Sequence, residues 1–228
     1  MSRFLILRLD GPMQAWGTHT FEDFRPSNLY PTRSGLLGLL AACLGIERAD
    51  HAEQSRLASS VEFSVRVDSA VERLDRNNPV AKSGVKLPDF HTVMGARKVD
   101  GSVNKFPVVS RREYLFDAAF TVAVGEREGA SYTLDQLAAA LRRPCYTPTL
   151  GRRACPLTLP LLDGVPVEAD DALAALRQTS GDGELIYSEI EGEPKGLPLR
   201  LRDVPLHGRH RQFGTRVVYL HKETPPCS

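Results

Sequence analysis

The sequence predicts an α+β fold, and three observations support this prediction. Several segments alternate apolar and polar residues with the two-residue period of a strand. Two other segments begin with residues that cap helices and continue into runs that suit a helix. The chain has 228 residues, of which 42% are hydrophobic and 25% are charged, which is usual for a globular protein that buries a substantial core.

The first part of the chain is predicted to form a strand, a buried helix and a second strand. Residues 3–10 have the pattern of a strand. Thr32 or Ser34 can then cap a helix, because a hydroxyl accepts from a backbone N–H that lacks a helical partner. This helix is apolar on nearly all sides and should be buried, and Gly45 can end it. Residues 61–67 alternate cleanly and predict a strand with one wet face.

The central part repeats this order. Residues 114–124 predict a strand, and Thr133 and Gln136 form a capping box that begins a helix ending near Arg143. Residues 155–161 can supply a further strand. The combined order is βαββαβ, which is the ferredoxin-like or RRM-like arrangement.

The last part of the chain predicts a smaller extension that contains strands. A short helix is capped near Asp170, and strands follow at 184–190 and 216–221. We therefore divide the chain into an RRM-like domain at residues 1–162 and a C-terminal extension at residues 163–228.

A basic insert at about residues 75–112 interrupts the predicted body. Its part from Lys82 to Arg112 carries a net charge of +5, whereas the rest of the chain carries −4. Scattered prolines and glycines exclude a regular helix, so an extended hairpin held out from the body is expected. Such a segment either contacts a polyanion or is a solvated loop, and charge alone favours neither.

Two short segments could hold phosphate. Arg33 and Ser34 lie at the start of the first helix, where backbone N–H groups, a hydroxyl and a guanidinium come together. Arg152 and Arg153 end a glycine-containing loop that Tyr146 precedes, and an arginine fork suits phosphate while a tyrosine can stack on an unpaired base. The alternatives are an ordinary helix cap and an exposed loop.

No catalytic or metal-binding pattern stands out. His91 and Met94 could form a wedge between bases or simply pack against a neighbour. His207 and His210 could serve a ribonuclease as acid and base, but they also suit a wet basic turn. There is no HExxH, Walker or GxGxxG motif, so neither a metal nor another cofactor is expected.

Nothing in the sequence indicates a membrane or secreted protein. No apolar run reaches the roughly 18 residues that a transmembrane helix needs. The first residues lack the features of a signal peptide. The four cysteines are scattered without a CxxC pair, so a reduced cytoplasm fits and a structural zinc site does not.

Several motifs, in a fixed order along most of the chain, carry a family resemblance. They include GPMQAWG at 11–17, PTRSGLLGLL at 31–40, REYL at 112–115, LGRR at 150–153 and RQF at 211–213. On these motifs the chain resembles the CasD family of the RAMP superfamily, whose members are subunits of the type I-E CRISPR surveillance complex, Cascade.

The resemblance implies a non-catalytic subunit with an RRM-like body and a projecting thumb, here the basic insert. Such subunits bind and cap the 5′ handle of the CRISPR RNA in antiviral defence, and the thumb kinks the guide and displaces a base. The implied partners are the CRISPR RNA, the Cascade backbone subunit and the large PAM-reading subunit. Target DNA would be reached only through the complex, because the guide reads it by base pairing.

The expected RNA-binding residues combine the residue chemistry with this resemblance. Phosphate contacts are expected from Arg33, Ser34, Arg112, Arg152 and Arg153, base contacts from Gln14, Trp16 and Tyr146, and thumb contacts from His91, Met94 and Lys105, with Arg111 and Thr149 as further contacts.

Two other functions remain open. A metal-independent endoribonuclease that processes CRISPR repeat RNA would use His91, Tyr114 or the pair of His207 and His210. A purely structural bridge would contact RNA only incidentally.

Overall fold

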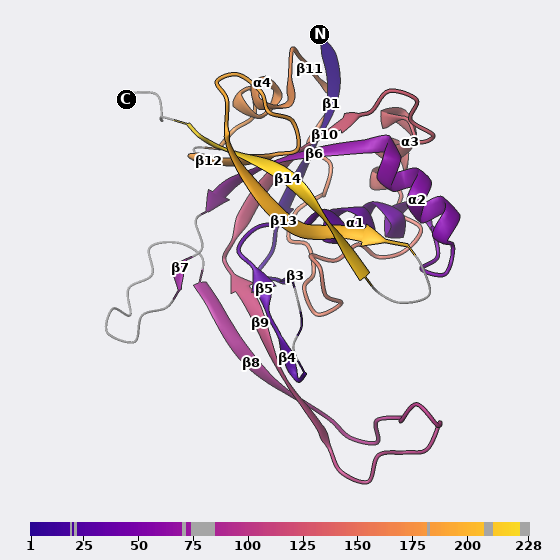
Figure 1. The fold of residues 1–228 in the computed structure, drawn as a ribbon. Coiled ribbons are helices and arrows are strands. Elements are labelled where there is room, and N and C mark those ends of the chain that lie inside the picture. The colour runs from indigo at the N-terminus through magenta and orange to yellow at the C-terminus, as the bar shows by residue number, and fades with distance from the viewer. Residues whose placement is uncertain are drawn as a thin grey trace.

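The body of the protein is a seven-stranded sheet in which every strand pairing is antiparallel (Figure 1). The structure is a computed structural model that describes residues 1–18, 20, 22–69, 72–73, 85–181, 183–207 and 212–223; Lys82 and His210 lie outside them. From edge to edge, the sheet contains β11 (Val167–Ala169), β1 (Ser2–Asp10), β10 (Ala119–Glu126), β6 (Val61–Ser69), β12 (Leu185–Ser188), β14 (Gln212–Lys222) and β13 (Leu197–Leu206).

Helices cover both faces of this sheet. The described residues contain α1 (Arg33–Leu44), α2 (His51–Ser60), α3 (Leu134–Arg142) and α4 (Ala172–Arg177). Because successive side chains of a strand point to opposite faces, Leu5 and Leu7 of β1 join the larger core with α1 and α3. Phe4 and Ile6 join a smaller core with α4 on the other face. The predicted α+β class is therefore confirmed.

The predicted helix ends are confirmed in detail. The Thr32 hydroxyl accepts from the Gly35 N–H at 3.3 Å and caps α1, and Gly45 ends this helix with a positive φ of 76°. Thr133 and Gln136 form the expected capping box of α3. These ends follow from local chemistry, so the sequence alone could locate them.

Two predicted strands are wrong in their bounds. Residues 114–124 form parts of two strands, β9 (Val108–Phe116) and β10, because the chain turns at Asp117, whose φ is 53°. Residues 155–161 form no strand, although the Arg8 N–H donates to the Leu161 carbonyl at 2.9 Å. Prolines in this segment lack the N–H that a continuous ladder needs. The strand at this edge is β11 instead.

From residue 85 on, the basic insert belongs to a long antiparallel hairpin, residues 85–116, that extends away from the seven-stranded sheet (Figure 1). Its two strands are β8 (Val85–Val93) and β9. Two short strands, β2 (Met13–Gln14) and β7 (Glu72–Arg73), join the hairpin at its base, and β4 (Phe24–Arg25) pairs farther along β9. A separate pair, β3 (Trp16–Gly17) and β5 (Ser27–Asn28), lies in the connection before α1.

A buried cluster of charges fastens the start of α1 to the C-terminal strands. The Glu189 carboxylate, only 5% exposed, pairs with the guanidinium groups of Arg33, Arg127 and Arg216. Arg216 also pairs with Asp203 at 2.6 Å. Burial lowers the pKa of the Arg33 guanidinium, and its pairing with Glu189 opposes this shift. The cluster joins residues that are more than 150 positions apart in the chain.

No helix among the described residues is long and apolar enough to cross a membrane.

The charge cluster yields a stability prediction. We expect Glu189→Ala to lower the free energy of unfolding by about 3–5 kcal/mol, because it leaves buried arginines without their carboxylate. Urea unfolding measures this change. Asp135→Ala is the control, since Asp135 pairs with Arg3 at 73% exposure and its loss should have no measurable effect. Equal losses in the two variants would contradict the structural role of the cluster.

Candidate nucleic-acid interface

A cavity of about 840 Å³ opens beside the N-terminus of α1. Its walls come from the connection between β1 and α1, from the first turns of α1, from the loop at 147–152, and from facing parts of β13 and β14. The polar side chains that line it are Thr18, Thr20, Arg25, Thr32, Ser34, Arg112, Thr147, Thr149, Arg152, Arg202 and Gln212.

The lining is cationic. Arg25, Arg112, Arg152 and Arg202 all reach it, and none of the described lining residues is acidic. Arginine stays protonated at any physiological pH, so the cavity carries a permanent positive charge. An anion that forms forked hydrogen bonds, such as phosphate, suits this lining best.

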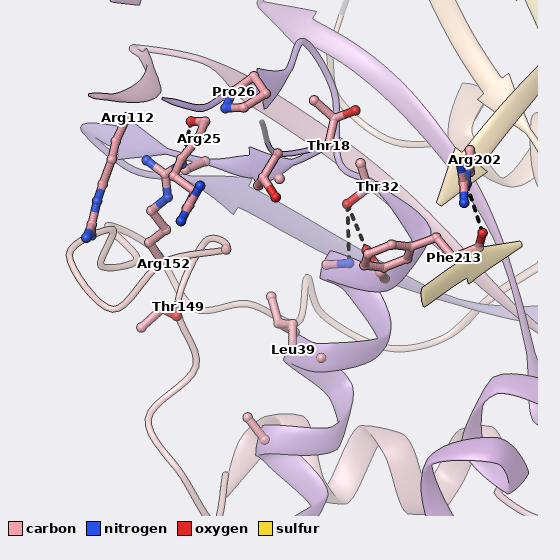
Figure 2. A pocket seen from close by; sticks show the side chains of 18 of the residues that line it. Thr18, Arg25, Pro26, Thr32, Leu39, Arg112, Thr149, Arg152, Arg202 and Phe213 are labelled. Carbon is pink, nitrogen blue, oxygen red and sulfur yellow. Dashed lines mark hydrogen bonds between the residues drawn. The ribbon is translucent and has the colours of Figure 1, made fainter. Parts of the chain in front are cut away.

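The cations lie on two sides of the cavity. Figure 2 shows Arg25, Arg112 and Arg152 close together on one side and Arg202 beside Phe213 on the other, with Thr32 between them. A ligand with several negative charges along its length can therefore contact both sides at once.

The protein holds Arg152 in place through its own backbone. Its guanidinium donates to the carbonyls of Glu113 at 3.0 Å and Arg25 at 2.9 Å. It also lies 4.7 Å from the centre of the Tyr114 ring, a cation–π distance. These contacts fix the charge without neutralising it, because a carbonyl and a ring carry no net charge.

Several hydroxyl groups of the lining are free to bind a ligand. The side-chain hydroxyls of four residues have no hydrogen-bond partner within the described part of the chain: Thr18, Thr20, Thr147 and Thr149. A threonine hydroxyl both donates and accepts, so it can contact a phosphate oxygen or a sugar hydroxyl. Guanidinium and hydroxyl groups together suit a sugar–phosphate backbone.

Four of the residues expected to bind RNA come together in this cavity. Ser34, Arg112, Thr149 and Arg152 lie on three separate segments of the chain, and all of them line the cavity. Their grouping was not visible in the sequence, because it depends on how α1, the hairpin and the 147–152 loop pack.

Three expected contacts are corrected by the structure. Gln14 and Trp16 are completely buried. Gln14 Nε2 donates to the backbone of Leu9 and Ala118, and its Oε1 accepts from the Trp16 indole at 3.0 Å, so both side chains are satisfied inside the core. Arg33, with a side chain 5% exposed, pairs with Glu189 and does not reach the cavity. None of the three presents a group to RNA in this structure.

The remaining expected contacts lie outside the cavity lining. Arg111, Tyr146 and Arg153 are exposed on the surface, and Tyr146 is 49% exposed. The three thumb residues lie on the hairpin: Met94 is 75% exposed, Lys105 is exposed, and His91 Nε2 lies 3.1 Å from the Tyr114 hydroxyl.

The expected contacts omitted Thr18, Thr20 and Thr147 of the lining, and also Arg25, Arg202 and Gln212. Arg25 stands alone in an irregular connection and gave no signal. Arg202 lies on β13, where leucine and arginine alternate from 199 to 202, and this two-residue period could have revealed it. Gln212 falls within the RQF motif and could have been taken from there.

The described residues contain no group of three or more histidine, cysteine or acidic side chains that could hold a metal ion. Cys43 is buried, and burial raises the pKa of its thiol to about 11. A thiol of that kind is a poor nucleophile and acts here as a small core residue.

Comparisons with known proteins agree with one another. Residues 4–219 match the family described as CRISPR-associated protein (Cas_Cas5). The CRISPR system Cascade subunit CasD of Escherichia coli (strain K12) is 45% identical over 223 residues, which cover 97% of each protein. A chain of a solved CRISPR RNA-guided surveillance complex is similar with a TM-score of 0.69 and 32% identity, covering 97% of this chain and 91% of that one. A second structure, described as a Cas protein, has a TM-score of 0.59 and 29% identity, covering 98% and 100%.

One glycine allows two walls of the cavity to meet. Gly151 has a φ of +90°, and a Cβ there would lie 1.9 Å from the Ala15 carbonyl oxygen. We expect Gly151→Ala to lower the free energy of unfolding by more than about 3 kcal/mol, because the backbone must move. Gly164→Ala is the matched control: its φ is +68° but the space is open, so only about 1 kcal/mol is expected. Urea unfolding compares them, and similar losses would refute the steric argument.

Proposed function

Because the chain belongs to the CRISPR-associated Cas5 family, we propose that it is a non-catalytic RNA-binding subunit of a CRISPR RNA-guided surveillance complex of the type I-E Cascade class. In this role it binds and caps the 5′ handle of the guide RNA in antiviral defence. The observation that carries the proposal is the cavity beside α1, which four arginines and several hydroxyls line and to which no described acidic residue contributes.

The chemistry of the cavity favours single-stranded RNA. Arginines and hydroxyls bind phosphate oxygens, and such contacts fix the position of a strand without reading its sequence. The ribose 2′-hydroxyl is both a donor and an acceptor, as are the threonines of the lining. Ser34, Arg112, Thr149 and Arg152 are therefore proposed as backbone contacts, together with Arg25 and Arg202.

The β8–β9 hairpin is proposed to be the thumb that kinks the guide and displaces a base. Its outer part exposes large apolar side chains, with Phe90 62%, Met94 75% and Phe106 74% exposed. Cations such as Lys105 lie among them. Exposed apolar groups next to cations suit unstacked bases next to phosphates.

The order of the strands supports the ferredoxin-like assignment of the body. The four strands β11, β1, β10 and β6 are neighbours in that order, and α1 and α3 lie in the connections from β1 to β6 and from β10 to β11. Residues 163–228, which we proposed as an extension, supply the fourth strand of this body, β11, and add β12, β13 and β14 to the same sheet. The face opposite α1 and α3 is covered by α4. RNA is therefore expected at the cavity and hairpin, not on the sheet face that RRM proteins use.

The proposed partners follow from this role. We expect the chain to assemble with the CRISPR RNA, the backbone subunit and the large PAM-reading subunit in a cytoplasmic ribonucleoprotein, and to meet target DNA only through that complex. Arg111, Tyr146 and Arg153 lie outside the cavity and are proposed as further RNA contacts on the adjoining surface.

A metal-independent endoribonuclease is the second candidate, and one contact favours it. His91 Nε2 lies 3.1 Å from the Tyr114 hydroxyl and 2.9 Å from an Asp89 oxygen, so a histidine is held between a phenol and a carboxylate. Tyr114, however, is only 2% exposed, and Arg152 lies against its ring. A buried phenol cannot reach a scissile phosphate, so we prefer the non-catalytic role.

Loss of a cavity arginine should weaken binding to the same extent for RNAs of different sequence. We expect Arg25→Ala and Arg112→Ala each to lower the affinity for a fluorescein-labelled CRISPR-repeat RNA about tenfold. Each variant should also make the dependence of log affinity on log salt concentration less steep, by the amount expected for about one lost phosphate contact. Fluorescence anisotropy from low to moderate salt measures both. Arg56→Ala is the control, since Arg56 is 61% exposed on α2 and lies outside the cavity. Equal effects in all three variants would overturn the proposed site.

The two candidate functions differ in the fate of the RNA. We expect the purified full chain to leave a labelled repeat RNA intact, with or without EDTA, because none of the described residues that line the cavity is a histidine or an acid. Gel electrophoresis of the products checks this. Cleavage at one defined bond that His91→Ala abolishes would establish the endoribonuclease instead.

A further inference from the structure

A buried aspartate connects two walls of the cavity. Asp203 on β13 is 7% exposed, and its Oδ2 accepts from the backbone N–H of Arg33 at 2.8 Å. Arg33 follows the cap residue Thr32 and precedes Ser34, and both of these line the cavity. One carboxylate oxygen of the C-terminal strands therefore contacts the beginning of the α1 wall.

The same carboxylate holds the neighbouring strand. Arg216 of β14 donates to Asp203 through Nε at 2.6 Å and through a terminal nitrogen at 2.8 Å. The second terminal nitrogen of Arg216 donates to Glu189 at 3.0 Å. Forked, charge-assisted bonds of this kind are strong and directional, so they fix orientation as well as distance.

Two consecutive residues of β13 act on two sides, at a place where the pairing of this strand is irregular. The pairing with β14 shifts register between Leu201 and Val204, and Arg202 and Asp203 lie in this bulge. Bulges re-aim side chains and often lie beside functional sites. Asp203 points into the buried charge cluster, whereas its neighbour Arg202 is exposed and lines the cavity.

We propose that Asp203 is a positioning residue of the RNA site: it docks the β13–β14 wall, which carries Arg202 and Gln212, against the α1 wall. This inference rests on the proposed RNA-binding function of the cavity. Asp203 acts through Arg202, whose Nε donates to the Phe213 carbonyl at 3.0 Å and thereby spans the two strands of the wall. Loss of the Asp203 charge moves this wall and removes the contribution of Arg202 to RNA affinity.

A double-mutant cycle tests the proposal on the full chain with a fluorescein-labelled CRISPR-repeat RNA. Asp203→Asn keeps the shape and removes the charge, and we expect it to lower RNA affinity about fivefold, as Arg202→Ala does. The two changes together should cost no more than about twofold beyond either alone, because one acts through the other. Arg25 lies on the opposite wall, so the losses of RNA affinity in Arg25→Ala and Asp203→Asn should multiply in the double mutant.

The control separates positioning from stability. Asp68 is also a carboxylate paired with a buried arginine, Arg66, but neither residue lines the cavity. We expect Asp68→Asn to lower the melting temperature without changing RNA affinity. If Asp203→Asn does not fold, Arg216→Lys takes its place, because lysine cannot form the two parallel hydrogen bonds with which Arg216 binds Asp203. Its loss of RNA affinity should likewise not multiply with that of Arg202→Ala.

The outcomes distinguish the two claims. Two results would overturn the positioning role and leave the RNA site standing. One is that the losses of RNA affinity in Asp203→Asn and Arg202→Ala multiply in the double mutant. The other is that Asp68→Asn loses as much RNA affinity as Asp203→Asn. If Arg25→Ala and Arg202→Ala both leave affinity unchanged, the RNA site itself is wrong, and the positioning role falls with it.

Discussion

The docking of the C-terminal strands onto α1 depends on a cluster of four buried charges and one exposed arginine. Glu189 and Asp203 hold Arg33 and Arg216, and Arg127 joins at the edge. An unpaired charge in this place would cost several kcal/mol. The C-terminal strands are therefore stable only in the position where each carboxylate of the cluster meets its arginines. Packing of apolar side chains alone would allow small shifts between layers. The charge cluster removes this freedom, and it thereby sets the distance between two walls of the cavity.

The same constraint explains why neighbouring residues have different roles. Arg33 and Ser34 are adjacent, yet the helix turns the arginine into the charge cluster and the serine toward the cavity. Arg152 lines the cavity, whereas Arg153 next to it is exposed elsewhere. A motif in the sequence shows that such residues occur together, but the direction of each side chain depends on distant partners. Glu189, the partner that decides the case of Arg33, lies 156 positions away.

The parts of the fold that the sequence predicts are those fixed by local chemistry. The N-terminal caps of α1 and α3 and the glycine stop of α1 were predicted because their hydrogen bonds span a few residues. α2 was missed because its ten residues contain one buried leucine and little periodicity, and β13 because prolines stand at positions 198 and 205. In the cavity, the arginines within motifs were predicted. Arg25 and Arg202 were not, since tertiary packing brings them to the cavity that Arg112 also lines.

The position of the cavity bears on what the protein can recognise. In an RRM-like body the open face of the sheet offers aromatic rings to bases, but here α4 and its core with Phe4 and Ile6 occupy that face. What remains accessible is a cavity lined by guanidinium and hydroxyl groups on two sides. Such groups bind the backbone of a strand and are indifferent to its bases. A strand whose phosphates meet Arg112 on one wall and Arg202 on the other must cross the cavity, and its path is then fixed by the protein. The proposed role of holding one end of a guide needs this property, because the rest of the guide must stay free to pair with its target.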